Sequence, residues 1–485
     1  MTIKQTKKIP ANSSLIFIVD KDVKKHPFFG VLNAREKEYV ASAGKDFEGA
    51  DGETVATLPG GRRAVFIARP EKFNHRKSIL LMRRIVAVAR EKRLQRIAVA
   101  GEDFRTGEKE FDTLVPRVAA MEFEIANFEF VKYKTPPKRG WNFIDEVLIY
   151  VDKERVITDI EKQLKEGKII GEEINETRKL SNTPGGDMTP EVLARAAVSA
   201  GTRTGFKTKV LNENEIKKLG MGGVLGVARG SSEKPRFIIM EYLKGGKEKP
   251  IVLVGKGVTF DSGGLNLKPS SGIYEMHMDM SGGAAVIHTL AAAARLKLAK
   301  NIIGLIPAVE NMPSGSSYHP GDLLKTMSGK TIEVLNTDAE GRVILADALH
   351  YAKRYDPELV IDIATLTGAA MVALGQRASA IFSTDEKFAK KMQESGELAG
   401  DYVWPLPLWE EYEDDIKGTF GDVANDAKTR YGGTITAAAF LWQFIKGTPW
   451  MHIDMAPRMT SIDGEYLAKG AAGSPVALLM QFLSE

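Results

Sequence analysis

The sequence contains no cysteine at all. Disulfide bonds, thiolate zinc sites and a cysteine nucleophile are therefore excluded, and the composition is compatible with a reducing compartment. No apolar run approaches the ~18 residues that suggest a membrane helix, so we expect no membrane association. The basic stretch at residues 1–8 is not followed by an apolar core long enough for a signal peptide. We therefore expect a cytoplasmic protein.

Several functional motifs are also missing. No His-Glu-x-x-His helix is present, which excludes the common single-zinc protease, and no Gly-x-Ser-x-Gly elbow sets up a nucleophilic serine. The net formal charge is only +4 in 485 residues, which by itself does not argue for nucleic acid as a partner. The glycine run at residues 220–226 misses the dinucleotide-binding spacing by one residue. We expect it to form a loop that turns beside a sheet.

The most informative stretch is Asn336-Thr337-Asp338-Ala339-Glu340-Gly341-Arg342, which follows a strand-like run at residues 331–335. Side chains two apart in a strand share a face, so we expect Asp338 and Glu340 to point the same way. Two carboxylates that close repel each other unless a positive charge, most simply a metal ion, lies between them. The alternative is an exposed acidic turn, with Arg342 as a helix-start residue.

A second charged segment lies upstream. The apolar run at residues 251–254 predicts a buried, parallel strand, and Lys256 comes at its end, where open α/β sheets place ligand sites. Asp261 follows among glycines, and Lys268 and Asp279 come before a helix start rich in small residues. Each charge alone is typical of a solvated surface. Together, and flanked by glycine or apolar residues, they indicate a functional site.

Residues 255–264 and 336–342 resemble the two signature segments of the leucyl aminopeptidase family of cytosolic two-metal exopeptidases. The similarity continues through segments 182–184, 362–369, 420–425, 433–438 and 469–473. The acidic signature is highly specific, whereas the chain before residue 182 contributes no segment to the resemblance.

The resemblance implies a site that binds two divalent ions. Asp261 and Glu340 would bridge the ions, Lys256 and Asp279 would complete the tighter site, and Asp338 the looser one. Lysine binds a cation only when neutral, so we expect the ions to lower the pKa of Lys256. Carboxylate ligands suit Zn²⁺ or Mn²⁺, and also Mg²⁺ or Co²⁺ at the looser position. The implied catalytic residues are Lys268 and Arg342, with a bicarbonate held at Arg342.

The implied activity is hydrolysis of the N-terminal residue from short peptides by a hydroxide that bridges the two metals, which would make the chain a leucyl aminopeptidase. The substrate-binding positions of the family correspond to Met276, Asn336, Ala339, Thr365, Leu366, Gly368, Ala456 and Met459. Two methionines in a pocket favour long, flexible apolar side chains such as leucine. The resemblance also implies a homohexamer made of two trimers.

Other functions compete with this interpretation. A binding or regulatory protein could keep the fold, but a pseudoenzyme would be expected to have lost a ligand, and the set here is complete. Carboxylate pairs also suit a two-metal phosphoesterase. Some bacterial members of the family bind DNA, but no helix in this sequence carries a dense basic stripe.

The pattern along the chain predicts an α/β protein, with a small N-terminal α/β domain and a larger catalytic α/β domain whose mixed sheet is flanked by helices. The expected boundaries are an N-terminal domain at 1–153, a linker helix at 154–181 and a catalytic domain at 182–485. Predicted strands cover residues 14–19, 63–68, 96–100, 302–306, 331–335, 359–363 and 451–455. Predicted helices cover residues 78–91, 283–296 and 343–354.

Overall fold

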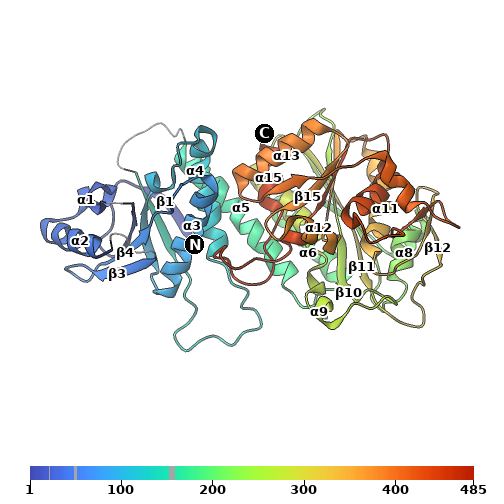
Figure 1. Ribbon diagram of the computed structural model, residues 1–485, viewed down its shortest axis with the longest axis horizontal. Helices are drawn as coiled ribbons and strands as arrows, with labels where there is room; N and C mark the ends of the chain where they lie inside the picture. The colour runs from blue at the N-terminus through green and yellow to red at the C-terminus, as the bar shows by residue number, and fades with distance from the viewer. Residues whose placement is uncertain (21, 48–51, 152–158) are drawn as a thin grey trace. The chain divides into compact units, whose positions relative to one another are not determined.

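The structure is a computed structural model that describes residues 1–485 except 21, 48–51 and 152–158. The chain divides into two compact units (Figure 1). The first comprises Met1–Glu172 with Ile462–Ala468, and the second Glu173–Ser461 with Lys469–Glu485. None of the helices in the described part of the chain is both long and apolar enough to cross a bilayer.

The first unit is built on a six-stranded sheet in the order β1-β6-β5-β2-β4-β3, which is parallel except at β3. Its strands are β1 (Thr2–Thr6), β2 (Ser14–Val19), β3 (Glu53–Thr57), β4 (Arg63–Ala68), β5 (Arg96–Ala100) and β6 (Glu146–Tyr150). Its helices are η1 (Val23–Lys25), α1 (Pro27–Val31), α2 (Ala34–Phe47), α3 (His75–Glu91), η2 (Gly101–Phe104) and α4 (Lys109–Ala126). Alternate residues of β2 and β4 pack with α1 and α2 into one apolar core.

The strands predicted at 14–19, 63–68 and 96–100 are confirmed as β2, β4 and β5. The helix predicted from Ser78 begins three residues earlier, at His75. Asn74 explains the difference, because its side chain accepts a hydrogen bond from the backbone N–H of Lys77 at 3.0 Å and so caps the helix.

Helix α5 (Ile160–Ser181) corresponds to the predicted linker helix. Residues 154–158 of that prediction lie outside the described residues, and the helix as described begins at Ile160. The division between the compact units falls within α5, between Glu172 and Glu173. The domain boundaries expected from the sequence stay a prediction.

The second unit contains a mixed sheet in the order β16-β15-β18-β14-β9-β11-β8-β7, with β10 paired to β11, and a smaller sheet β12-β13-β17. Its strands are β7 (Lys207–Leu211), β8 (Arg236–Leu243), β9 (Ile251–Gly255), β10 (Gly257–Asp261), β11 (Asn301–Asn311), β12 (Leu323–Lys325), β13 (Thr331–Glu333), β14 (Leu359–Ala364), β15 (Ser379–Ser383), β16 (Val403–Pro405), β17 (Val423–Ala424) and β18 (Trp450–Asp454). Its remaining helices are α6 (Pro190–Thr204), α7 (Glu213–Lys218), α8 (Gly222–Ala228), α9 (Ser270–Ile273), η3 (Met276–Met278), α10 (Ser281–Leu296), α11 (Glu340–Ala352), η4 (Lys353–Tyr355), α12 (Gly368–Leu374), α13 (Glu386–Ala399), η5 (Glu410–Ile416), α14 (Gly433–Ile445), η6 (Ala456–Arg458) and α15 (Val476–Ser484).

The centre of this sheet positions the site. Strands β9, β11, β14 and β18 are parallel to one another, and β10 runs parallel to β11. Their carboxyl ends therefore lie along one edge, which is where open α/β sheets bind ligands. The buried, parallel strand predicted at 251–254 is confirmed as β9. The strands predicted at 302–306, 359–363 and 451–455 are confirmed as β11, β14 and β18, but β11 continues well beyond the predicted end, to Asn311.

Two sequence predictions fail locally. The strand expected over 331–335 ends at Glu333. The glycine run at 220–226 does not form a loop, because residues from Gly222 onward form helix α8. The glycines there allow close packing: a Cβ on Gly222 would lie 2.0 Å from the carbonyl oxygen of Lys325, and one on Gly223 would lie 2.5 Å from that of Val343.

Candidate metal centre

Lys256 lies between β9 and β10, and its side chain is almost completely buried. Its Nζ is 2.8 Å from a carboxylate oxygen of Asp279 and 2.8 Å from one of Glu340. It also donates a hydrogen bond to the backbone carbonyl of Thr365 at 3.0 Å. Three segments far apart in the sequence therefore meet at this one amine.

Asp261 ends β10 and forms the second half of the cluster with Lys268 and Asp338. Lys268 Nζ is 2.8 Å from Asp261 Oδ2 and 2.5 Å from Asp338 Oδ1. The loop between Asp261 and Lys268 turns through Gly263 and Gly264, whose φ angles are +88° and +66°. That conformation is unfavourable for residues with a Cβ, so the glycines allow Lys268 to return to the carboxylates.

The acidic signature does not place its carboxylates as the sequence analysis expected. Asp338 lies in a turn and Glu340 begins α11, so strand alternation is not what brings them together. Gly341 is required here, because a Cβ at that position would lie 2.5 Å from Cε of Lys256. Arg342, one residue later in α11, is buried and donates from Nη1 to the carbonyl of Asn425 at 2.9 Å.

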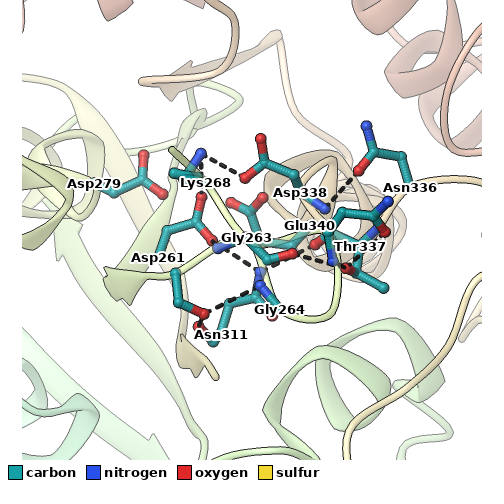
Figure 2. Close-up of polar contacts among 12 residues, drawn as sticks. Asp261, Gly263, Gly264, Lys268, Asp279, Asn311, Asn336, Thr337, Asp338 and Glu340 are labelled. Carbon is teal, nitrogen blue, oxygen red and sulfur yellow. Dashed lines mark hydrogen bonds and ion pairs between the residues drawn. The ribbon is translucent and has the colours of Figure 1, made fainter. Parts of the chain in front are cut away.

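The predicted ligands nevertheless converge (Figure 2). Carboxylate oxygens of Asp261, Asp338 and Glu340 all lie within 4.8 Å of one another. Among the described residues, the buried oxygens Asp279 Oδ2, Asp338 Oδ1 and Glu340 Oε1 contact only the lysine ammoniums, at 2.5–2.8 Å. Two lysines cannot neutralise four carboxylates, so the cluster keeps excess negative charge and unused lone pairs. Hard oxygen donors with unused lone pairs fit divalent cations, so the residues present suit the implied metals.

The charges in this cluster perturb one another strongly. Burial raises the pKa of the Asp261 carboxyl to about 7, and the neighbouring charge of Glu340 adds to the rise. Burial alone would lower the pKa of Lys256, but Asp279 and Glu340 outweigh it and hold that pKa above its usual range. The pKa of Lys268 is raised in the same way, with Asp261 as the largest opposing charge. The neutral form of Lys256 expected from the sequence depends on a dication beside it and stays a prediction.

Three residues to which the sequence analysis gave no role support the ligands. Asn311, at the end of β11, donates from Nδ2 to Asp261 Oδ1 at 2.8 Å and to the carbonyl of Thr337 at 3.0 Å. Thr337 in turn donates from its hydroxyl to the carbonyl of Gly263 at 2.7 Å. Tyr318 donates to the Thr337 carbonyl at 2.7 Å. These bonds join the two signature segments around the carboxylates.

Asp454, at the end of β18, was also missed. It accepts hydrogen bonds from the backbone N–H groups of Leu366, Thr367 and Ala456 at 3.1, 3.3 and 3.2 Å. It also accepts hydroxyl hydrogen bonds from Thr367 at 2.6 Å and Thr434 at 3.0 Å. Two of the predicted substrate-binding positions, Leu366 and Ala456, are therefore held by one buried carboxylate. Its place at a strand end was the signal that could have identified it.

The other predicted substrate positions lie close to these groups in the chain and in space. Thr365 donates from its hydroxyl to Asp279 Oδ1 at 2.6 Å. Asn336 accepts at Oδ1 from the backbone N–H of Asp338 at 2.9 Å. The remaining four lie within a few residues of these contacts: Met276 begins η3 before Asp279, Ala339 precedes Glu340, Gly368 begins α12 after Thr365, and Met459 follows η6.

Comparison with known proteins agrees with this geometry. The model of the cytosol aminopeptidase family, catalytic domain, matches residues 175–480. A probable cytosol aminopeptidase of Aromatoleum aromaticum is 49% identical over 330 residues, which cover 68% of this chain and 65% of that protein. One of Methylobacillus flagellatus is 44% identical over 363 residues, covering 75% and 72%. The chain thus spans about two thirds of the length of the curated relatives it matches.

Among solved structures, the bottromycin maturation enzyme BotP in complex with Mn superposes with a TM-score of 0.84 at 29% identity. That match covers 98% of this chain and 99% of the other, so it includes both units. The α/β architecture expected from the sequence is confirmed, and so is the family resemblance. The chain belongs to the cytosol aminopeptidase family.

Proposed function

We propose that the chain is a two-metal aminopeptidase that removes the N-terminal residue, preferably leucine or another apolar residue, from short peptides. The observation that carries this proposal is the cluster of four carboxylates and two lysines at the carboxyl edge of the sheet, where the carboxylates outnumber the lysines by two. Membership of the cytosol aminopeptidase family supports it.

The family resemblance implies the ligand roles, and the contacts are compatible with them. Asp261 and Glu340 would hold both ions, Lys256 and Asp279 would complete one site, and Asp338 the other. When bound, two divalent ions would polarise the scissile carbonyl and activate a water molecule. Zinc and manganese both suit these donors, and Mg²⁺ or Co²⁺ would suit the side of Asp338.

Lys268, which is not a ligand, and Asp279, which is one, would bind and orient the peptide. Lys268 is the more exposed of the two lysines, at 16% against 4%, and its raised pKa keeps it protonated. Its ammonium would therefore hold the oxygen of the scissile carbonyl as negative charge develops there. Asp279 would accept a hydrogen bond from the free α-amine of the peptide, which restricts cleavage to the N-terminal residue.

Arg342 would hold a small anion, as the corresponding arginine of the family holds bicarbonate. Its Nε–H is buried and donates no hydrogen bond to a described residue, and Asp426 Oδ1 is 4.0 Å from Nη1. A guanidinium binds planar oxyanions in pairs of hydrogen bonds, and bicarbonate has that shape. A bicarbonate held there could accept and return a proton, which arginine itself does not do.

The proposed substrate preference rests on the apolar side chains at the predicted substrate-binding positions. Met276, Ala456 and Met459 are partly buried, and all three are apolar. Flexible methionine side chains adapt to long apolar groups, which favours leucine at the cleaved position. A panel of p-nitroanilides of single amino acids tests this preference: leucine or methionine should be cleaved best, and a strong preference for aspartate or glutamate contradicts it.

One experiment tests the activity itself. The metal-loaded protein should hydrolyse leucine p-nitroanilide, should not hydrolyse its N-acetyl form, and should lose activity in excess chelator and regain it with Zn²⁺ or Mn²⁺. Hydrolysis of p-nitrophenyl phosphate in place of the anilide identifies a phosphoesterase instead. Hydrolysis of neither substrate by metal-loaded protein favours a binding or regulatory role.

Assembly into a homohexamer is a further part of the proposal. In the second unit, Tyr274, Val372, Phe420 and Tyr431 expose 82%, 89%, 81% and 72% of their surface. Large exposed apolar side chains are typical of surfaces that bind another protein. Light scattering should give six times the chain mass of 53.2 kDa, and a monomer contradicts it. A cytoplasmic location stays a prediction from the sequence.

A further inference from the structure

A recess in the first unit, remote in sequence from the metal cluster, carries a concentration of positive charge. Its volume is about 700 Å³, and Arg62, Arg63, Lys92, Arg93 and Arg96 line it. We call it the basic recess. A volume of this size is typical of small-molecule sites.

The recess lies at the amino ends of four parallel strands. Ser14 begins β2, Arg63 begins β4 and Arg96 begins β5, while Asp145 immediately precedes β6. Because β2, β4, β5 and β6 are parallel, these ends share one edge of the sheet. Asp145 is the one carboxylate among the described lining residues.

Three of the five cations form no ion pair with a carboxylate of the described residues, although Glu36 attracts Arg62 from a longer distance. Arg62 donates from Nε to the carbonyl of Ser13 at 2.9 Å, and Arg63 donates from Nη1 to that of Lys92 at 2.9 Å. Arg93 donates to the carbonyl of Arg139 at 3.4 Å. Neutral carbonyls orient a guanidinium but do not cancel its charge.

The other two cations have carboxylate partners. Lys92 pairs with Glu91 at 2.7 Å, and Arg96 pairs with Glu146 at 2.5 Å. Helix α3 ends beside the recess, but the C-terminus of a helix carries only about half a negative charge. The negative charges of Asp145 and of the helix C-terminus together are smaller than the positive charge of the three guanidiniums. Burial lowers the pKa of Arg62, so this cation has already lost part of its hydration.

A second, independent observation points to a ligand. Ser13 lines the recess and is only 1% exposed, and its Oγ has no hydrogen-bond partner among the described residues. A buried hydroxyl without a partner is costly and is normally satisfied by a ligand or water. A hydroxyl donor beside several guanidiniums matches an anion with more than one oxygen.

We propose that the basic recess is a binding site for a small polyanion of the phosphate-ester or pyrophosphate class. Oxygens of such a ligand would accept hydrogen bonds from Arg63 and Arg93, and from Ser13 once its buried hydroxyl turns towards the recess. The recess is concave and contains Asp145, whereas a surface for duplex nucleic acid presents a continuous array of cations to successive phosphates. This site is independent of the proposed peptidase activity.

Titration calorimetry of the full chain with inorganic pyrophosphate tests the proposal. The double variant Arg63→Gln/Arg93→Gln should weaken binding roughly tenfold or more, because charge-assisted hydrogen bonds to phosphate are lost. The control Arg35→Gln/Lys45→Gln removes the same two charges from exposed positions of α2, outside the recess, and should change the affinity less than about twofold. Ser13→Ala should weaken binding without any change of charge.

Each opposite result overturns the proposal. Wild-type protein that binds no pyrophosphate has no such site. Equal weakening by both double variants means that only net charge matters, and binding that no variant weakens belongs elsewhere, for example at metal ions. Duplex DNA that binds through Arg63 and Arg93 when pyrophosphate does not would identify a nucleic-acid surface. Unfolding temperatures of the variants within about 2 °C of wild type ensure that folding is not the cause.

Discussion

Both units place charged side chains at one edge of a largely parallel sheet, but the two groups differ in sign and in how their charges are paired. In the second unit, four carboxylates face two lysines at the carboxyl ends of the strands, and each lysine contacts two carboxylates. In the first unit, cations gather at the amino ends, and within the described part of the chain three of them donate to carbonyl oxygens and form no ion pair. The excess negative charge suits metal cations, and the excess positive charge suits an anion.

The two groups also differ in burial. Lys256, Asp261, Asp279 and Glu340 are each at most 3% exposed, so every charge there must be neutralised within the cluster. The cations of the basic recess are exposed or half-buried, and water can satisfy them. We therefore expect changes in the metal cluster to have much larger effects than changes in the recess, and the predictions below test that order.

The largest effect is expected from Glu340→Gln. The change keeps the size of the side chain but removes the charge that faces Lys256, so the central bridging position loses its affinity for a dication. We expect kcat on leucine p-nitroanilide to fall roughly 10³-fold or more, together with metal content measured by mass spectrometry. Glu310→Gln, on β11 but outside the cluster, is the control. Full metal content with near-normal activity in Glu340→Gln contradicts the assigned role.

Lys268→Ala should have the next largest effect. Lys268 would stabilise the developing negative charge, and loss of one such donor typically costs roughly 10²- to 10³-fold in kcat. Metal content should change far less than kcat, because the five proposed ligands remain. Equal losses of kcat and bound metal would show that Lys268 acts through the metals and would remove its catalytic role.

Asn311→Ala should have an intermediate effect. Asn311 touches no proposed substrate atom but orients Asp261, and loss of such a partner costs roughly 10- to 100-fold in metal affinity or activity. Asn301→Ala is a matched control, because Asn301 is also buried on β11 but bonds the carbonyls of Gly246 and Glu248 at the opposite end of the strand. Both variants should lose stability, and only Asn311→Ala should require more metal for half-maximal activity. A similar metal requirement in both contradicts the positioning role.

The contrast between the two units also explains what the sequence could predict. Four of the five proposed metal ligands lie in the motifs at 255–264 and 336–342, and Asp279 follows the first motif by 15 residues, so local patterns identified them. For Asp454 the sequence offered only its place at a strand end. Its hydrogen-bond partners depend on the pairing of β18 with β14, which sets Asp454 opposite Ala364. The reason given for Asp338 and Glu340 was wrong, because the start of α11 rather than a strand turns Glu340 inward.

The basic recess was even harder to predict from the sequence. Its cations come from two separate segments, 62–63 and 92–96, each of which resembles an ordinary solvated stretch with a few basic residues. Only the parallel pairing of β2 with β4 and β5 brings Ser14, Arg63 and Arg96 to one edge. No local pattern in the sequence reports that pairing, so the first unit contributed fold elements to the sequence analysis but no site.

The smallest effect concerns the stability of the recess itself. Its guanidiniums repel one another, and salt screens that repulsion within a Debye length of about 10 Å at 0.1 M. Raising the salt from 0.01 M to about 0.15 M, where the Debye length shortens from about 30 Å to about 8 Å, should therefore raise the Tm of wild type more than that of Arg63→Gln/Arg93→Gln. The difference should be on the order of 1 °C. The control Arg35→Gln/Lys45→Gln has the same net charge as Arg63→Gln/Arg93→Gln. Because its changes lie outside the recess, its Tm should respond to salt like that of wild type. Identical salt responses in all three proteins would show that these cations do not repel one another measurably, and the charge excess inferred for the recess would be wrong.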